Sequence, residues 1–86
     1  MIKQILNQFE ELFNGKYDPL RFSIDIPKLI AHNLDKIKKE NIEIAQIFND
    51  DVPDICDEGE QGFDPTHMIA ELKKVYDKVT QMIAKN

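Results

Sequence analysis

Apolar residues recur at spacings of three and four along most of this 86-residue chain, which carries only three glycines and four prolines. Such spacing places the apolar side chains on one face of an α-helix, and no segment shows the strict alternation that is typical of a half-buried strand. A chain of this length has room for one domain. We therefore predict that residues 1–86 form a single all-α domain, an antiparallel four-helix bundle with short loops.

Turn and capping residues mark where the helices are expected to begin and end. Asp18-Pro19 and Asp64-Pro65 each place a capping aspartate before a proline at the first helical position, where its missing N–H costs nothing. Asn41 is expected to cap a further helix, and Gly15 suits a left-handed conformation at the end of the first one. The four expected helices span residues 1–13, residues 19 to about 39, residues 42 to about 58, and residues 65 to near the end.

Two prolines lie inside these expected helices. A proline in a helix interior removes one backbone hydrogen bond and clashes with the preceding turn. We therefore expect kinks near Pro27 and Pro53, and a bend or break of the second helix at residues 23–26.

The helical faces also predict which side chains form the core. The third helix carries a stripe from Ala45 to Ile55 with Cys56 at its edge, and the inner face of the last helix extends to Ile83. Seven residues are predicted to be buried, namely Phe9, Leu12, Leu29, Leu34, Phe48, Leu72 and Val79.

Charge is distributed unevenly along the chain. Residues 50–64 contain seven acidic residues and no lysine or arginine. Because the whole chain has a net charge of −5, the other 71 residues together carry +2. The seven acidic residues are Asp50, Asp51, Asp54, Asp57, Glu58, Glu60 and Asp64.

This acidic segment argues against one class of partner and favours another. Nucleic-acid binders use basic patches to neutralise phosphate, so we expect no direct contact with nucleic acid. The segment also contains the apolar residues Val52, Pro53, Ile55 and Phe63. A mixed acidic and apolar surface suits a basic protein, because charges steer association while apolar groups anchor it. The plainer interpretation is a solvated surface that keeps the protein soluble. The sequence leaves both interpretations open.

Candidates for catalysis and metal binding are few. Neither His32 nor His67 has a partner four residues away that would make a helical metal site, and Cys56 fits a small buried apolar residue. A calcium loop that starts at Asp57 has a glycine at its sixth position but no suitable ligand at its third and twelfth. We therefore expect a protein that is not an enzyme and has no cofactor, while a weak Ca²⁺ or Mg²⁺ site stays open.

The same residues predict a cytoplasmic protein with no membrane partner. A single cysteine excludes an internal disulfide, as is typical of reducing compartments. No apolar run exceeds three residues, whereas a membrane-spanning helix needs about 20. We also expect no signal peptide, because no apolar run follows Lys3.

Several segments of the chain resemble the colicin D-type immunity proteins, the bacterial self-protective colicin-like immunity family. The resemblance extends from Phe9 to Met82. It is carried by LFNGK at residues 12–16, YDPLRF at residues 17–22, IFNDDVPDIC at residues 47–56, the acidic residues that follow, and Glu71-Leu72 in the last helix.

This resemblance implies a four-helix bundle that binds and blocks a toxin nuclease made by the same cell. It also implies that acidic side chains cover a basic, tRNA-cleaving active site, so the segment from Asp50 to Asp64 is predicted to contact the toxin. The alternative function is a non-catalytic adaptor or regulatory bundle that acts through its helical faces.

Overall fold

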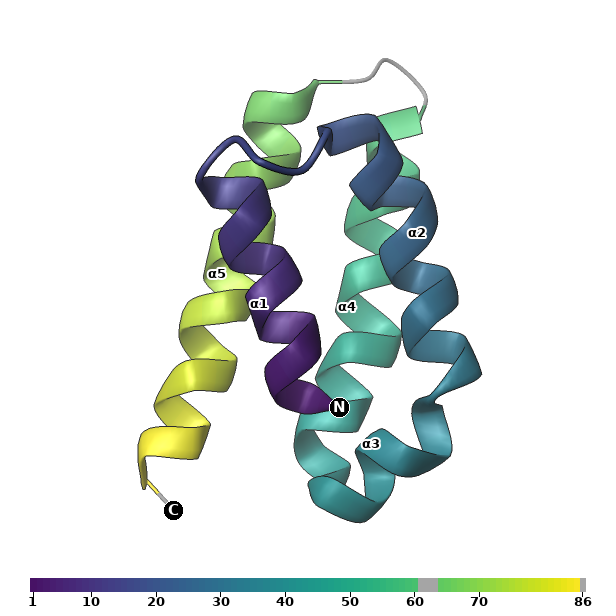
Figure 1. Cartoon of the computed structure of the whole chain (residues 1–86), viewed down its shortest axis with the longest axis vertical. Helices are drawn as coiled ribbons and strands as arrows, with labels where there is room; N and C mark the ends of the chain where they lie inside the picture. The colour runs from purple at the N-terminus through teal and green to yellow at the C-terminus, as the bar shows by residue number, and fades with distance from the viewer. Residues whose placement is uncertain (61–63, 86) are drawn as a thin grey trace.

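Five α-helices make up the computed structural model, which describes residues 1–60 and 64–85, with the backbone alone at residues 58–60 (Figure 1). They are α1 (Ile2–Phe13), α2 (Pro19–His32), α3 (Leu34–Glu40), α4 (Ile42–Glu60) and α5 (Pro65–Lys85). The four longer helices alternate in direction, and the start of α1 and the end of α5 both lie in the lower half of Figure 1. No strand occurs in the described residues, so the predicted all-α class is confirmed there.

The structure has five helices where four were predicted, because Asn33 divides the expected second helix into α2 and α3. The Asn33 backbone leaves the helical conformation, with φ −119° and ψ 16°. Its side-chain Nδ2 donates a hydrogen bond to the Leu29 carbonyl at 2.8 Å. An asparagine side chain that bonds a carbonyl of the preceding turn competes with the regular helical ladder, so the chain ends one helix and begins another.

The break that was predicted at residues 23–26 is wrong. Helix α2 continues through Pro27, and α4 continues through Pro53. The fixed φ of proline is itself helical, so the cost is one backbone hydrogen bond and a local clash. Burial of Phe22 and Ile26 beside Pro27 offsets that cost. The kinks near the two prolines stay predictions.

The predicted capping residues are confirmed. A side-chain oxygen of Asp18 accepts the backbone N–H of the residue three positions on, at 3.1 Å. Asn41 accepts two backbone N–H groups of α4 at 3.0 and 3.1 Å, and Asp64 accepts two of α5 at 3.1 and 3.3 Å. Gly15 adopts φ 75°, the left-handed conformation expected after α1.

Most of the predicted core is buried, with two exceptions. Leu29 and Leu34 are only half-buried, because they flank the Asn33 interruption where the inner face of the helix changes direction. The other five predicted core residues are buried, namely Phe9, Leu12, Phe48, Leu72 and Val79.

Two further positions differ from the predicted stripes. On α4 the buried stripe ends with Cys56, which is 1% exposed, while Ile55 is half-buried. On α5 the predicted inner face ends before Ile83, which is 46% exposed. Helix α4 is therefore rotated slightly from the predicted orientation, and the last turns of α5 extend beyond the core.

Phe9 connects the four longer helices. Its ring centroid lies 5.3 Å from that of Phe22 on α2, 6.1 Å from that of Phe48 on α4, and 6.4 Å from that of Tyr76 on α5. Aromatic pairs at such distances add to the stabilisation from their buried area. This contact fixes which side of α4 faces the core, and therefore which side faces out.

Candidate functional site

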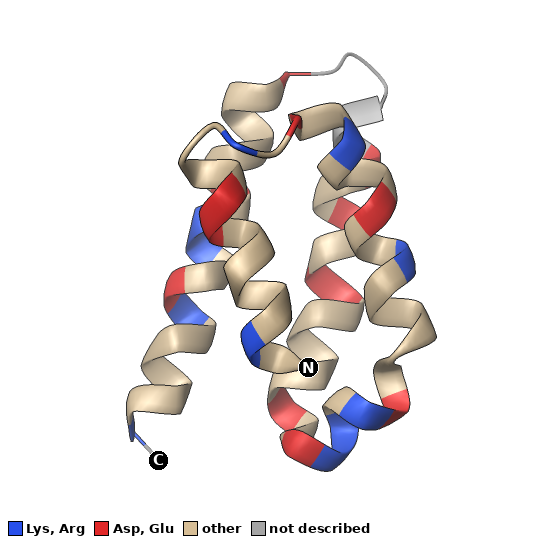
Figure 2. Cartoon of the chain, in the orientation of Figure 1, with Lys and Arg blue, Asp and Glu red and all other residues tan. Residues whose placement is uncertain are grey.

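The acidic residues of α4 lie on the outer side of that helix. Asp50, Asp51, Asp54 and Asp57 are exposed, and we call these four residues the acidic face. Spacings of four and three place Asp50, Asp54 and Asp57 in one row, with Asp51 beside it. Figure 2 shows the run of acidic positions along α4.

Two features hold α4 in this orientation. Asn41 caps its first turn, and its inner stripe packs against α2, α3 and α5. Ala45, Phe48, Val52 and Cys56 form this stripe and are at most 1% exposed. Any rotation that turned the acidic face inward would expose these residues to water and bury unpaired charge, and both changes are costly.

The four carboxylates of the acidic face form no hydrogen bond or ion pair with any described residue, whereas some carboxylates elsewhere do. Glu40, for example, lies 2.9 Å from the Met1 ammonium, and its bond to this group lowers the pKa of the Glu40 carboxyl. Asp25 accepts a hydrogen bond from the Tyr17 hydroxyl at 2.8 Å. The four carboxylates of the acidic face are therefore available to bind a cationic group of another molecule.

A groove between α4 and α5 borders the acidic face. Its larger part has a volume of about 470 Å³, with Asp50 and Asp51 on the α4 side. The half-buried side chains of Ile47 and Met82 form the apolar part of this lining. The groove therefore combines carboxylates with an apolar surface, as a protein-binding site requires.

The structure places other charges at this groove that the sequence prediction missed. Glu43 lines the larger hollow with Asp50, and their spacing of seven on one helix could have indicated this. Lys74 and Lys78 of α5 line a hollow of about 280 Å³ with Asp51. The acidic segment contains no basic residue in sequence, but two lysines border it in space. That border results from packing of α4 against α5, which no local pattern predicts.

Of the remaining predicted site residues, only Asp64 is described with its side chain. Asp64 precedes α5, where its Oδ1 accepts the two backbone N–H groups described above, so it has a structural role. Glu58 and Glu60 belong to the last turn of α4, and their side chains lie outside the described residues. The structure thus brings together four of the seven predicted residues.

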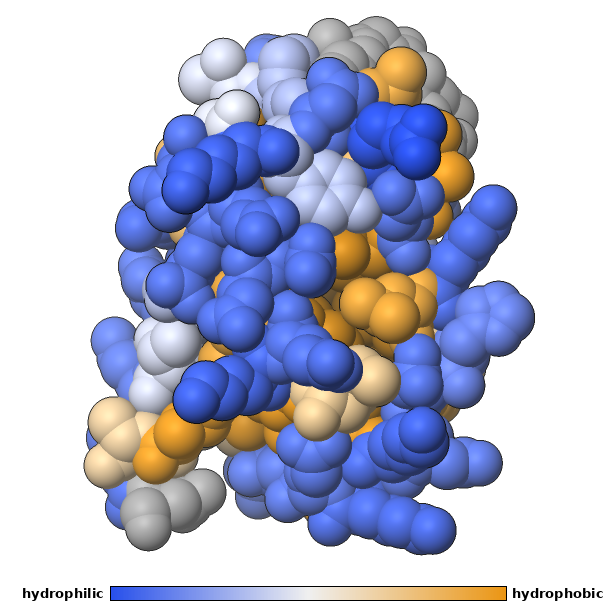
Figure 3. Space-filling model, in the orientation of Figure 1, coloured by the Kyte–Doolittle hydropathy of each residue, from blue (hydrophilic) through white to orange (hydrophobic). Residues whose placement is uncertain are grey.

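A second groove opens among the start of α1, the start of α4 and the end of α5. It has a volume of about 510 Å³, and its apolar lining is Ile2, Leu6, Ile44 and Ile83. Figure 3 shows hydrophobic surface at the lower left of the molecule, beside the end of α5. No residue of the acidic face lines this second groove.

The nucleophilic and metal-binding candidates remain separate from one another. Cys56 is buried, and the buried Ser23 hydroxyl donates to the Leu20 carbonyl at 2.7 Å. His32 and His67 are exposed on α2 and α5. Within residues 1–60 and 64–85, no group of three or more His, Cys, Asp or Glu residues is arranged to hold a metal ion. Among the same residues, no helix has the length and apolar character needed to cross a membrane.

Comparisons of the chain with protein-family models, with curated proteins and with solved structures found no match. The function therefore has to be inferred from the chain's own residues and geometry.

Proposed function

We propose that this protein is an immunity protein that binds and neutralises a basic bacterial toxin domain, a tRNA-cleaving nuclease by the resemblance of its sequence. The observation that carries the proposal is the row of exposed carboxylates on α4 that have no partner among the described residues. In this proposal the scaffold is an antiparallel four-helix bundle of α1, α2, α4 and α5, with α3 as the connection. The inhibitor itself supplies no catalysis and needs no cofactor.

The proposed mechanism is electrostatic mimicry of phosphate. A nuclease holds its substrate with lysine, arginine and histidine side chains, and carboxylates at matching positions occupy that groove in place of phosphates. Opposite charge on the two proteins raises the association rate above the ~10⁵–10⁶ M⁻¹s⁻¹ that is typical of neutral partners. Binding is then expected to weaken as salt concentration rises.

The charges around the α4–α5 groove indicate where the contact is centred. Lys78 forms no ion pair within the described residues and repels a basic surface that approaches from the α5 side, whereas the charge of Lys74 is balanced by Glu71 at 3.1 Å. We therefore place the centre of the contact over Asp50, Asp54 and Asp57 on the outer side of α4. The half-buried apolar groups of the groove then lie at the margin of the contact, where they exclude water.

The adaptor function remains the second candidate because of the apolar groove at the other end of the molecule. Ile83 is 46% exposed at this groove, and an exposed apolar surface is typical of a protein-binding site. One substitution at this groove distinguishes the immunity function from the adaptor function, because the two predict different effects on binding. Ile83→Glu should leave toxin binding intact under the immunity proposal and should abolish partner binding under the adaptor proposal.

The experiment that tests the immunity function starts from the neighbouring gene. The probe is the C-terminal domain of a large secreted protein encoded beside this chain, selected for a basic net charge. Under the proposal, co-expression of this chain protects cells from that domain, and the two purified proteins bind with an affinity that falls as salt rises. A toxic basic domain that this chain neither binds nor neutralises would contradict the proposal.

A further inference from the structure

Helix α2 exposes an apolar ridge beside α4. Leu20 is 47% exposed and Ile24 is 41% exposed, and their spacing of four places them on one side of the helix. Helix α2 packs against α4, where Pro53 is half-buried. Leu29, on the opposite edge of α2, lines a hollow with residues of α1. The ridge therefore lies on the side of α2 that is turned away from α1, next to α4.

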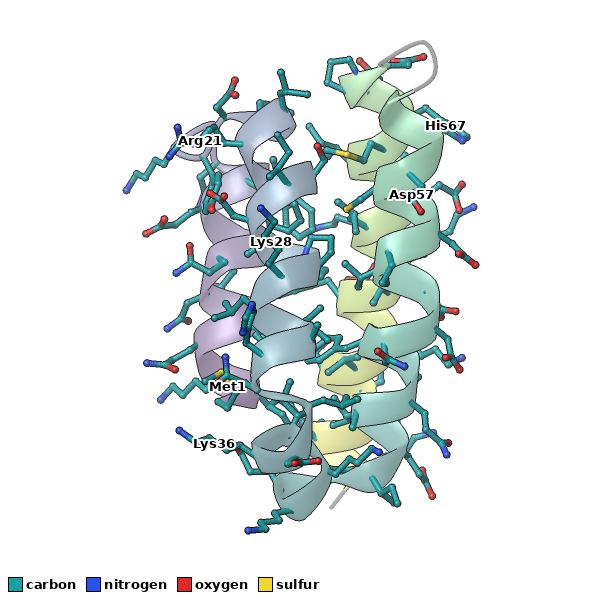
Figure 4. The ribbon with its side chains drawn as sticks, turned by 90° about the vertical axis from the view of Figure 1, so that its right-hand side faces the viewer. Met1, Arg21, Lys28, Lys36, Asp57 and His67 are labelled. Carbon is teal, nitrogen blue, oxygen red and sulfur yellow. The ribbon has the colours of Figure 1, made fainter. Side chains whose placement is uncertain are left out.

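The ridge has opposite charges on its two sides. Successive steps of four residues turn by about 40° around a helix, so the row of Leu20 and Ile24 continues into Lys28, which is exposed and forms no ion pair within the described residues. Asp57 lies on α4, on the other side. Figure 4 looks onto α2 and α4, with Arg21 and Lys28 on the α2 side and Asp57 on α4 at a height between them.

We infer that this surface binds a second copy of the same chain through a two-fold axis parallel to the helices. Such an axis lays the ridge of one copy on the ridge of the other and turns Lys28 toward the acidic face of the partner. Lys28 then meets Asp57 of the second copy, and the same contact occurs again by symmetry. A two-fold axis in the plane of the contact but perpendicular to the helices would instead bring the two Lys28 sides together and the two Asp57 sides together.

The inferred contact is small. Two partly exposed apolar side chains and one lysine–aspartate pair from each copy are expected to bury less than the ~800 Å² that each partner contributes to a standard interface. We therefore expect a weak dimer that forms only at high protein concentration. Two exposed apolar side chains from each copy form the centre, and the charges form the rim.

This inference goes beyond the proposed function and can fail separately from it. In the dimer Asp57 contacts Lys28 of the second copy, so dimer formation and binding of a basic toxin compete for one part of the acidic face. A toxin present in excess would then dissociate the dimer by mass action.

Sedimentation velocity of the full chain, from micromolar to millimolar concentration, tests the apolar part of the contact. The wild type is expected to shift reversibly from monomer to dimer, and Ile24→Glu to weaken the dimer about tenfold or more, because it buries an unpaired charge at the centre. Ile83→Glu is the matched control, since Ile83 is similarly exposed but lies on α5. A wild type that stays monomeric throughout, or equal effects of the two substitutions, would overturn the inference.

A charge exchange tests the two-fold geometry. Lys28→Glu and Asp57→Lys should each weaken the dimer, because each sets two like charges together. The double variant Lys28→Glu/Asp57→Lys should recover it, because the opposite charges meet again with exchanged positions. A double variant as weak as either single variant would overturn the proposed axis. Both substitutions are at exposed positions, and thermal melting by circular dichroism checks that each of the three variants folds.

Discussion

The inner and outer sides of α4 are composed of different residue types and have different consequences for stability. Phe48 and Val52 on the inner side are fully buried, and Phe48 contacts Phe9 across the core. Asp50 and Asp54 on the outer side are exposed and contact no charged partner in the described part of the chain. The inner side therefore contributes to the free energy of unfolding, while the outer side is available to other molecules.

The outer side of α4 lowers the stability of the helix that carries it. Like charges spaced by three or four residues repel each other, as Asp50, Asp54 and Asp57 do. The last turn of α4 contains no basic residue, and acidic residues near a helix C-terminus are unfavourable because that end carries a partial negative charge. Stability does not explain this arrangement of charges, whereas the proposed contact with a cationic partner would explain it.

The largest expected effect comes from the inner side. Phe48→Ala should lower the free energy of unfolding by about 3–5 kcal/mol, because it removes a fully buried ring and leaves a cavity. Urea denaturation measures this change, with Asn49→Ala at the neighbouring exposed position as the control. A loss below about 1 kcal/mol would mean that the inner side does not determine stability.

Carboxylates of the acidic segment should differ from one another according to their hydrogen bonds. Asp64→Ala should lower the free energy of unfolding by about 0.5–2 kcal/mol, because it removes the cap of α5. Asp50→Ala should cause no loss and should raise the free energy of unfolding slightly, since that carboxylate forms no bond with a described residue and its repulsion with Asp54 is removed. Equal losses in the two variants would show that the segment does not divide into structural and unpaired carboxylates.

The hydrogen bond between Tyr17 and Asp25 should contribute to the free energy of unfolding in a way that depends on pH. Burial and the hydrogen bond to Asp25 raise the pKa of Tyr17 to about 12. Because this exceeds the ordinary value of about 10, the wild type should exceed Tyr17→Phe in stability by about 0.5–1.5 kcal/mol below pH 10. The difference should disappear as the pH rises through about 12. Denaturation at several alkaline pH values measures it, and a constant difference would contradict the assigned hydrogen bond.

The smallest expected effect has the opposite sign. Asp54→Asn removes repulsion with Asp50 and Asp57, so at low salt it should raise the free energy of unfolding by about 0.2–0.5 kcal/mol for each like-charge pair removed. The gain should shrink as salt is added, because exposed charges are screened. A clear loss of stability at low salt would show that Asp54 has a stabilising partner.

The sequence predicted those parts of the fold that local chemistry determines. Asp18, Asn41 and Asp64 cap helices because their side chains reach N–H groups only two or three residues away. The apolar spacing also identified the buried side of α1 and most of the buried side of α4, because residues three and four apart share one face of a helix. Asn33 was missed because asparagine also occurs inside the uninterrupted helices α1 and α4, and its bond to the Leu29 carbonyl is one of several that its side chain can make.

The candidate site was predicted only in part, because its margins depend on packing between helices. The row of Asp50, Asp54 and Asp57 follows from spacing along one helix. The position of Lys78 beside that row depends on how α5 lies against α4. The role of Asp64 in the cap could have been weighed against its assignment to the site, since one carboxylate oxygen rarely serves both purposes.

One measurement tests most directly whether location, and not net charge, gives the acidic face its function. The rate and affinity of toxin binding are compared at low and moderate salt for the wild type and two variants with the same change in net charge. The first variant is Asp50→Asn/Asp54→Asn/Asp57→Asn, and the matched control is Glu10→Gln/Asp35→Asn/Asp77→Asn at exposed positions of other helices. We predict that the first variant binds about tenfold or more weakly and loses much of its salt dependence, because charges at the contact determine both. The control should bind nearly as the wild type does, and equal weakening of the two variants, or none in the first, would contradict the proposal.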